Sequence, residues 1–85
     1  MQYSLYYSNF CYFCQKVLMS LRGRQHNIEL VSVGDAGRRQ ELINGGGKGQ
    51  VPCLRIEEPD GSVSWLYESD DILDYIAAQN LISTS

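Results

Sequence analysis

The chain has 85 residues, of which 44% are hydrophobic, and this length fits one small domain, residues 1–85, with one modest core. A net charge of −3 argues against nucleic acid or an anionic membrane surface as its main partner. No apolar run reaches the length of a membrane span, the first residues lack the basic start of a signal peptide, and three cysteines are too few for a disulfide framework. We therefore expect a cytoplasmic protein whose thiols are kept reduced.

The first expected element is a strand over residues 3–7, which are apolar and aromatic, and a helix follows it. Four apolar residues then recur at the i, i+3, i+4 and i+7 spacing of one helix face: Cys14, Val17, Leu18 and Leu21. Cys11 therefore falls at the start of this helix, and Cys14 lies one turn later on its apolar face. The positive end of the helix dipole favours a thiolate at Cys11. The pair thus predicts an exposed nucleophile followed by a shielded second thiol.

The middle of the chain predicts a second strand and a second helix. Gly23 is expected to cap the first helix, and apolar residues within 28–33 indicate the second strand. The second helix is expected over about residues 36–44, until the glycine run 45–47 breaks it.

The last part of the chain predicts a hairpin and a final helix. Residues 53–56 and 63–67 form the two strands around a turn at 58–61, and the helix runs from about 69 to 79. The order β-α-β-α-β-β-α predicts an α/β fold with a four-stranded mixed sheet and helices on both faces. A CxxC pair that follows the first strand of such a unit is typical of a thioredoxin-like fold.

The CxxC pair itself allows three interpretations. Cys11 and Cys14 can be inert packing residues, or they can be half of a zinc site. A zinc site lacks its second CxxC pair here, since Cys53 and the lone His26 are the other candidate ligands. Thiol–disulfide exchange is the interpretation we favour, because the pair stands at a helix start.

Two further motifs each have a structural and a functional interpretation. Pro52 opens a strand, either because an edge tolerates it or because a cis bond after Val51 exposes the Val51 backbone to an extended peptide. Glu68, Ser69 and Asp70 can form an acidic helix cap. They can also hold an amino-acid zwitterion, with Ser69 and N–H groups on the carboxylate and Asp70 or Glu68 on the ammonium. The sequence leaves these alternatives open.

Four more side chains complete the candidate site. Tyr12 and Phe13 lie between the two thiols and are expected to form the wall of a groove. Arg39 and Lys48 flank the approach to Val51-Pro52. They are most simply solvated cations, but they can also bind an anionic ligand.

Taken together, these motifs resemble the glutaredoxins, with a close likeness to the N-terminal domain of glutathione transferases, which shares the thioredoxin fold. The resemblance covers nearly the whole chain through four segments: Leu5-Tyr6-Tyr7, Cys11-Tyr12-Phe13-Cys14, Gln50-Val51-Pro52 and Glu68-Ser69-Asp70-Asp71-Ile72. It implies that Cys11 is the nucleophile, Cys14 the resolving thiol and Pro52 a cis proline.

The resemblance also implies a glutathione site. The Val51 backbone would hold the cysteinyl part of glutathione, and Arg39 and Lys48 would meet its glycyl carboxylate. The γ-glutamyl end would be held by three residues at the start of the last helix: Glu68, Ser69 and Asp70.

The chain departs from the glutaredoxin pattern at three places. Tyr12 stands where Pro usually follows the first cysteine, and Ser8 stands where a Lys is usual. The Glu68-Ser69 pair replaces a common Gly-Gly and is similar to the transferase pattern. A working transferase needs an all-helical second domain, and we expect no room for one in 85 residues.

The expected function is glutathione-dependent thiol–disulfide oxidoreduction through Cys11, with release by a second glutathione or by Cys14. One alternative is a module in which Cys11 of two chains and two glutathiones hold a [2Fe–2S] cluster. Another is a thioredoxin-like domain that binds glutathione or partners without catalysis. The expected partners are glutathione and disulfide-bearing or glutathionylated proteins, and we expect a monomer.

Overall fold

The computed structural model describes residues 1–82 and has four strands and three helices in the predicted order. The strands are β1 (Gln2–Tyr7), β2 (Ile28–Ser32), β3 (Cys53–Glu57) and β4 (Val63–Tyr67). The helices are α1 (Tyr12–Leu21), α2 (Ala36–Gly46) and α3 (Ser69–Ala78). The predicted α/β class is therefore confirmed. Within the described range, none of the helices combines the length and the apolar character that crossing a membrane requires.

The four strands form one mixed sheet in the order β2-β1-β3-β4. β1 runs parallel to β2, with Leu5 opposite Leu30, and antiparallel to β3, with Leu5 opposite Leu54. β3 and β4 form an antiparallel hairpin in which Leu54 pairs with Leu66. Because a parallel pair needs a crossover connection, α1 must pass over one face of the sheet between β1 and β2.

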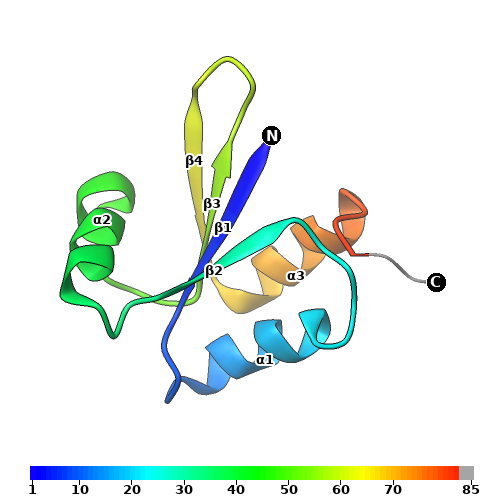
Figure 1. Cartoon of the computed structure of the whole chain (residues 1–85), viewed down its shortest axis with the longest axis horizontal. Helices are drawn as coiled ribbons and strands as arrows, with labels where there is room; N and C mark the ends of the chain where they lie inside the picture. The colour runs from blue at the N-terminus through cyan, green and yellow to red at the C-terminus, as the bar shows by residue number, and fades with distance from the viewer. Residues whose placement is uncertain (83–85) are drawn as a thin grey trace.

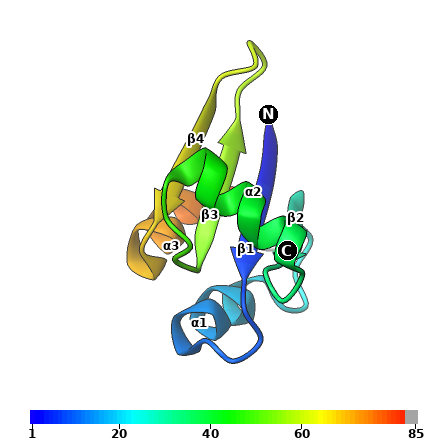
Figure 2. The same ribbon diagram turned by 90° about the vertical axis from the view of Figure 1, so that its left-hand side faces the viewer.

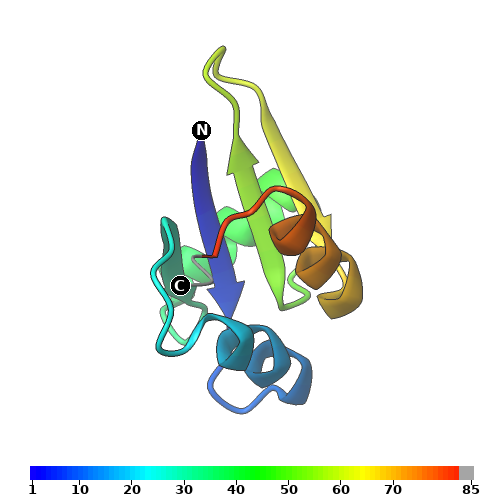
Figure 3. The same ribbon diagram turned by 90° about the vertical axis from the view of Figure 1, so that its right-hand side faces the viewer.

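The helices cover both faces of the sheet, as predicted. α2 lies on one side and α1 and α3 lie together on the other (Figure 1). The α2 side faces the viewer in Figure 2, and the side with α1 and α3 faces the viewer in Figure 3. The end of β1 and the start of α1 meet at one end of the sheet, far from the β3–β4 turn (Figure 3).

Each face of the sheet has its own apolar core, because successive side chains of a strand point to opposite faces. Leu5 packs on the side of α1 and α3, whereas the next residue, Tyr6, packs on the side of α2. The first core consists of Leu5, Val17, Leu21, Ile28, Leu54, Ile56, Ile72 and Ile76. The second and smaller core consists of Tyr6, Val31, Val33, Leu42 and Cys53.

The glycine run does not break α2 where the sequence predicted. Gly45 and Gly46 belong to the helix, and Gly47 ends it with a φ of 88°. The reason is tertiary, because a Cβ atom on Gly45 would lie 2.1 Å from the Trp65 ring, and one on Gly46 would lie 2.0 Å from the Tyr67 hydroxyl. These glycines let α2 approach β4 closely, so the predicted break at residues 45–47 was wrong by two residues.

The other boundaries differ slightly from the prediction. The cap of α1 is Arg22, whose N–H donates to the Leu18 carbonyl at 3.0 Å, and Gly23 follows it with a φ of 73°. Val33 lies beyond the end of β2, although it is buried, and α3 ends at Ala78. Helix ends fray, and differences of one or two residues are ordinary.

Candidate functional site

Cys11 is the N-cap residue of α1. Its backbone is extended, with φ −107° and ψ 120°, and its sulfur accepts the N–H of Cys14 at 3.3 Å. This bond satisfies one of the N–H groups that a helix start leaves without a partner. The side chain remains partly exposed, so the sulfur sits between solvent and the positive end of the helix.

The other two cysteines are inaccessible. Cys14 has no exposed surface, and its sulfur accepts the Ser8 N–H at 3.4 Å. Burial raises the pKa of Cys14 to about 12, with the neighbouring Cys11 acting in the same direction. Burial also raises the pKa of Cys53 to about 12. At neutral pH both groups are therefore neutral thiols, and Cys11 is the thiol that solvent reaches.

A loop between α2 and β3 supplies the second side of the site. The peptide bond between Val51 and Pro52 is cis, and the Cys11 thiol donates to the Val51 carbonyl at 3.8 Å. Pro52 itself is buried, whereas Val51 is half-buried. The backbone of Val51 thus lies beside the sulfur of Cys11.

The start of α3 supplies the third side. Glu68 precedes the helix with a φ of 74° and a ψ of 121°, a sparsely populated conformation that costs a non-glycine residue about 1–3 kcal/mol. Its carboxylate accepts the Gln50 amide at 3.3 Å. No side chain caps the helix, and Ser69 at its first turn is 7% exposed. The N–H groups of this helix start are therefore left for another partner.

These three segments enclose a hollow of about 140 Å³. Its lining comprises Phe13, Gln50, Val51, Pro52, Glu68, Ser69 and Asp70. All of these except Gln50 were predicted as binding residues from the sequence. Gln50 adjoins the Val51-Pro52 motif, and that position is the signal that could have found it.

Lys16 is a second residue that the sequence analysis missed. Its ammonium pairs with the Asp70 carboxylate, so an ion pair joins α1 to the start of α3. Lys16 follows Phe13 by three residues, which places both on one side of α1. The spacing of three residues from Phe13, a predicted groove residue, is the sequence signal that could have identified Lys16.

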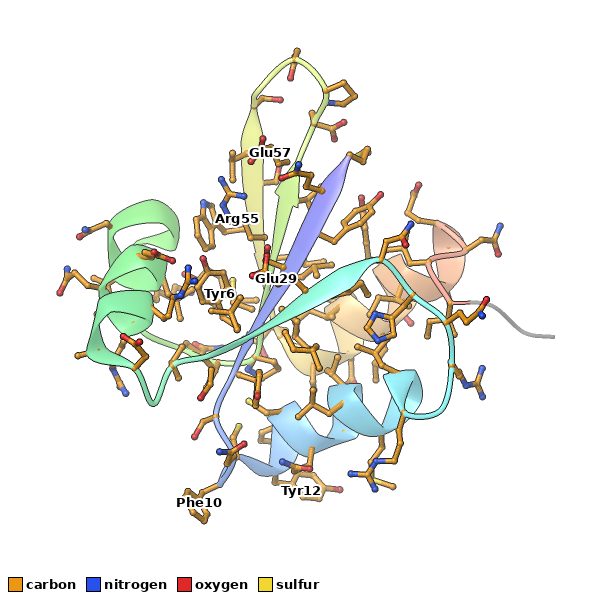
Figure 4. The ribbon with its side chains drawn as sticks, in the orientation of Figure 1. Tyr6, Phe10, Tyr12, Glu29, Arg55 and Glu57 are labelled. Carbon is orange, nitrogen blue, oxygen red and sulfur yellow. The ribbon has the colours of Figure 1, made fainter. Side chains whose placement is uncertain are left out.

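Three of the residues predicted to bind glutathione lie outside the hollow. Tyr12 is 76% exposed, and its ring contacts Phe13 edge-on at 5.3 Å between centroids. Figure 4 shows Tyr12 and Phe10 at the lower edge of the molecule, pointing away from the sheet. Lys48 lies over the Tyr67 ring, 5.1 Å from its centroid, and Arg39 is an exposed residue of α2. Lys48 thus lies against Tyr67, and neither cation is among the residues that line the hollow.

A larger hollow, of about 500 Å³, lies on the α2 face and contains no cysteine. Figure 4 labels several of its polar side chains, among them Tyr6, Glu29 and Arg55. The Tyr6 hydroxyl donates to Glu41, and the Arg55 guanidinium pairs with Glu57 at 3.0 Å. The charged side chains that line this larger hollow are thus largely paired within the chain, and the hollow contains no reactive thiol.

The cysteines and His26 do not come together. The His26 ring nitrogen accepts the Ile28 N–H at 3.1 Å. Among residues 1–82, no group of three or more His, Cys, Asp and Glu side chains is placed to hold a metal ion.

Comparisons with known proteins complete the description of the site. A search of curated proteins found no match. A family model described as "Glutathione S-transferase, N-terminal domain" matches residues 5–80. The resemblance seen in the sequence put the glutaredoxins first, and the match is to the transferase domain. Since the match covers most of the chain, the chain belongs to the glutathione S-transferase N-terminal domain family, with its thioredoxin-like fold.

Proposed function

We propose that this domain is a glutathione-dependent thiol–disulfide oxidoreductase of the glutaredoxin type, acting through Cys11. One observation carries the proposal. The accessible sulfur of Cys11 lies 3.8 Å from the carbonyl of Val51, and Val51 lines the same hollow as the uncapped start of α3. A nucleophile and a place for an anionic peptide therefore stand next to each other.

The hollow fits one end of glutathione better than the whole tripeptide. Its volume of about 140 Å³ is below the range of pockets that enclose a complete ligand. In the proposed complex the γ-glutamyl carboxylate meets the N–H groups of α3 and the Ser69 hydroxyl, as anions do at helix starts. Asp70 takes the ammonium, and the cysteinyl part pairs with the Val51 backbone. This arrangement directs the glutathione sulfur toward Cys11.

The proposed reaction consists of two exchanges. The Cys11 thiolate attacks the glutathione sulfur of a mixed disulfide, forming a disulfide with glutathione and releasing the substrate thiolate, which takes up a proton. A second glutathione thiolate then attacks the glutathione sulfur bound to Cys11, which yields oxidised glutathione and restores the Cys11 thiolate. Because burial raises the pKa of Cys14 to about 12, the second glutathione is favoured over Cys14 as the resolving thiol near neutral pH.

Reduction of a glutathionylated peptide by glutathione, measured with three single variants, tests this proposal. Cys11→Ser should abolish turnover, because it removes the nucleophile. Cys14→Ser should retain most of the rate, because the two-glutathione route needs one protein thiol. Cys53→Ala is the control for loss of a buried thiol and should stay active. Turnover by Cys11→Ser would refute the assignment, and glutathione binding without turnover by the wild type would indicate a non-catalytic binding domain.

A further inference from the structure

We propose that Lys16 determines the specificity of this site for γ-glutamyl thiols. Lys16 and Asp70 form an ion pair that opens around the α-amino-acid end of glutathione, with Lys16 on the carboxylate and Asp70 on the ammonium. This inference rests on the proposed function, since it assigns a further residue to the same site.

The position of Lys16 supports this role. Its ammonium contacts the Asp70 carboxylate at the rim of the hollow, and the two side chains are 42% and 78% exposed. Phe13, one turn earlier on α1, lines the hollow itself. Both partners of the pair can therefore reach a ligand that enters from solvent.

The start of α3 carries more negative than positive side chains, so a nearby cation would favour binding of a carboxylate there. Glu68, Asp70 and Asp71 place three carboxylates within the first residues of this helix. An entering carboxylate is attracted by the N–H groups of the helix start but repelled by these three side chains. Gln50, which binds Glu68, is neutral. Among residues 1–82, Lys16 is the cation that pairs with this acidic group, and it offsets the repulsion.

The ion pair between Lys16 and Asp70 also matches the two charges of an α-amino-acid group. An α-amino acid carries its ammonium and its carboxylate on one carbon atom, so both charges arrive together. The ligand can then exchange one contact between Lys16 and Asp70 for two contacts with its own groups. A thiol that lacks the α-amino-acid group cannot replace the contact between Lys16 and Asp70, so the ion pair adds nothing to its binding free energy. Selectivity for a γ-glutamyl thiol follows.

Binding of three S-methylated tripeptides, measured by calorimetry, tests the inference without any turnover. The first is S-methylglutathione, the second has a glutaryl group that lacks the ammonium, and the third has a γ-aminobutyryl group that lacks the α-carboxylate. Lys16→Gln should weaken the first two about three- to five-fold, the size expected for an exposed ion pair, and leave the third unchanged. Asp70→Asn should weaken the first and third and spare the second. Lys16→Arg should restore binding.

Arg38→Gln is the matched control, because it breaks another exposed ion pair, with Glu41 on α2, and should change no affinity. Tighter binding by Lys16→Gln would mean that Lys16 competes for Asp70, and equal effects on all three ligands would mean that it has no role in selection. Either result, or wild-type protein that binds none of the ligands, overturns the inference. Binding in the expected pattern without reduction of mixed disulfides would instead refute the proposed function alone.

Discussion

Replacing Gly46 by alanine should destabilise the domain, although alanine favours helices. The added methyl group would lie 2.0 Å from the Tyr67 hydroxyl oxygen and 2.9 Å from the ring carbon that bears it. The ring must therefore move, and with it the hydrogen bond that its hydroxyl donates to the Lys48 carbonyl at 3.1 Å. This bond holds the loop that leads to Val51.

The expected loss follows from three contributions. Overpacking costs about 2 kcal/mol, and losing the Tyr67 hydrogen bond costs about 1 kcal/mol. The higher helix propensity of alanine offsets about 1 kcal/mol of this loss in stability. The free energy of unfolding should thus fall by about 2 kcal/mol, which urea unfolding followed by circular dichroism can measure.

Gly37→Ala is the matched control in the same helix. There the nearest neighbour of the new methyl group is the Asp35 carboxylate at 3.2 Å, which caps α2 by accepting the Gly37 N–H at 2.8 Å and needs to move by only a few tenths of an ångström. The free energy of unfolding of Gly37→Ala should stay within about 0.5 kcal/mol of the wild-type value or exceed it. If Gly46→Ala were as stable as Gly37→Ala, the close packing of α2 on β4 would be refuted.

Two further predictions concern pH and backbone strain. Burial raises the pKa of Cys14 and Cys53 from 9.0 to about 12, so their neutral thiols stabilise the fold below pH 9 and this contribution is lost as the pH rises toward 12. Urea unfolding under reductant should therefore show less stability at pH 10 than at pH 7, and Cys53→Ala should reduce that difference by about 1 kcal/mol. Glu68→Gly should raise the free energy of unfolding by about 1 kcal/mol relative to Glu68→Ala, because the backbone strain that glycine avoids at a φ of 74° exceeds its extra loss of backbone entropy. Equal free energies of unfolding for these two variants would show that the backbone at residue 68 is not strained.

Local patterns were sufficient for most of the fold. The spacing of Cys14, Val17 and Leu21 placed one face of α1 in the core, where all three are buried. The same was not true of the glycine run. A local rule treats Gly45 and Gly46 as helix breakers, whereas their conformation is decided by Trp65 and Tyr67, about twenty residues later. Contacts of that range leave no trace in the periodicity of the helix itself.

In the candidate site too, local sequence patterns predicted some residues, whereas residues placed by distant contacts were missed. Val51, Pro52 and Ser69 were predicted because each stands in a recognisable motif at the end of an element. Lys16 was missed because it lies on the exposed side of α1, where a lysine is ordinary, and because its partner Asp70 is 54 residues away. Such a pair becomes visible when the two helices are placed together, since no local spacing relates its members.

In the proposed complex, two cations offset the repulsion between an acidic domain and an anionic tripeptide. Glutathione carries a carboxylate at each end, and in the proposed complex Lys16 meets the γ-glutamyl end at α3. Lys48 belongs to the loop just before Val51 and is held there by the Tyr67 ring, on the approach expected for the glycyl end. In the proposed complex the glutathione sulfur faces Cys11 beside the Val51 backbone, so a ligand must be long enough to reach the start of α3 with its amino-acid end and Cys11 with its sulfur. Free cysteine carries its sulfur next to its only zwitterionic end, so it cannot occupy the start of α3 and present its sulfur to Cys11 at the same time. The proposed complex therefore predicts selection for the length of the ligand as well as for its charges.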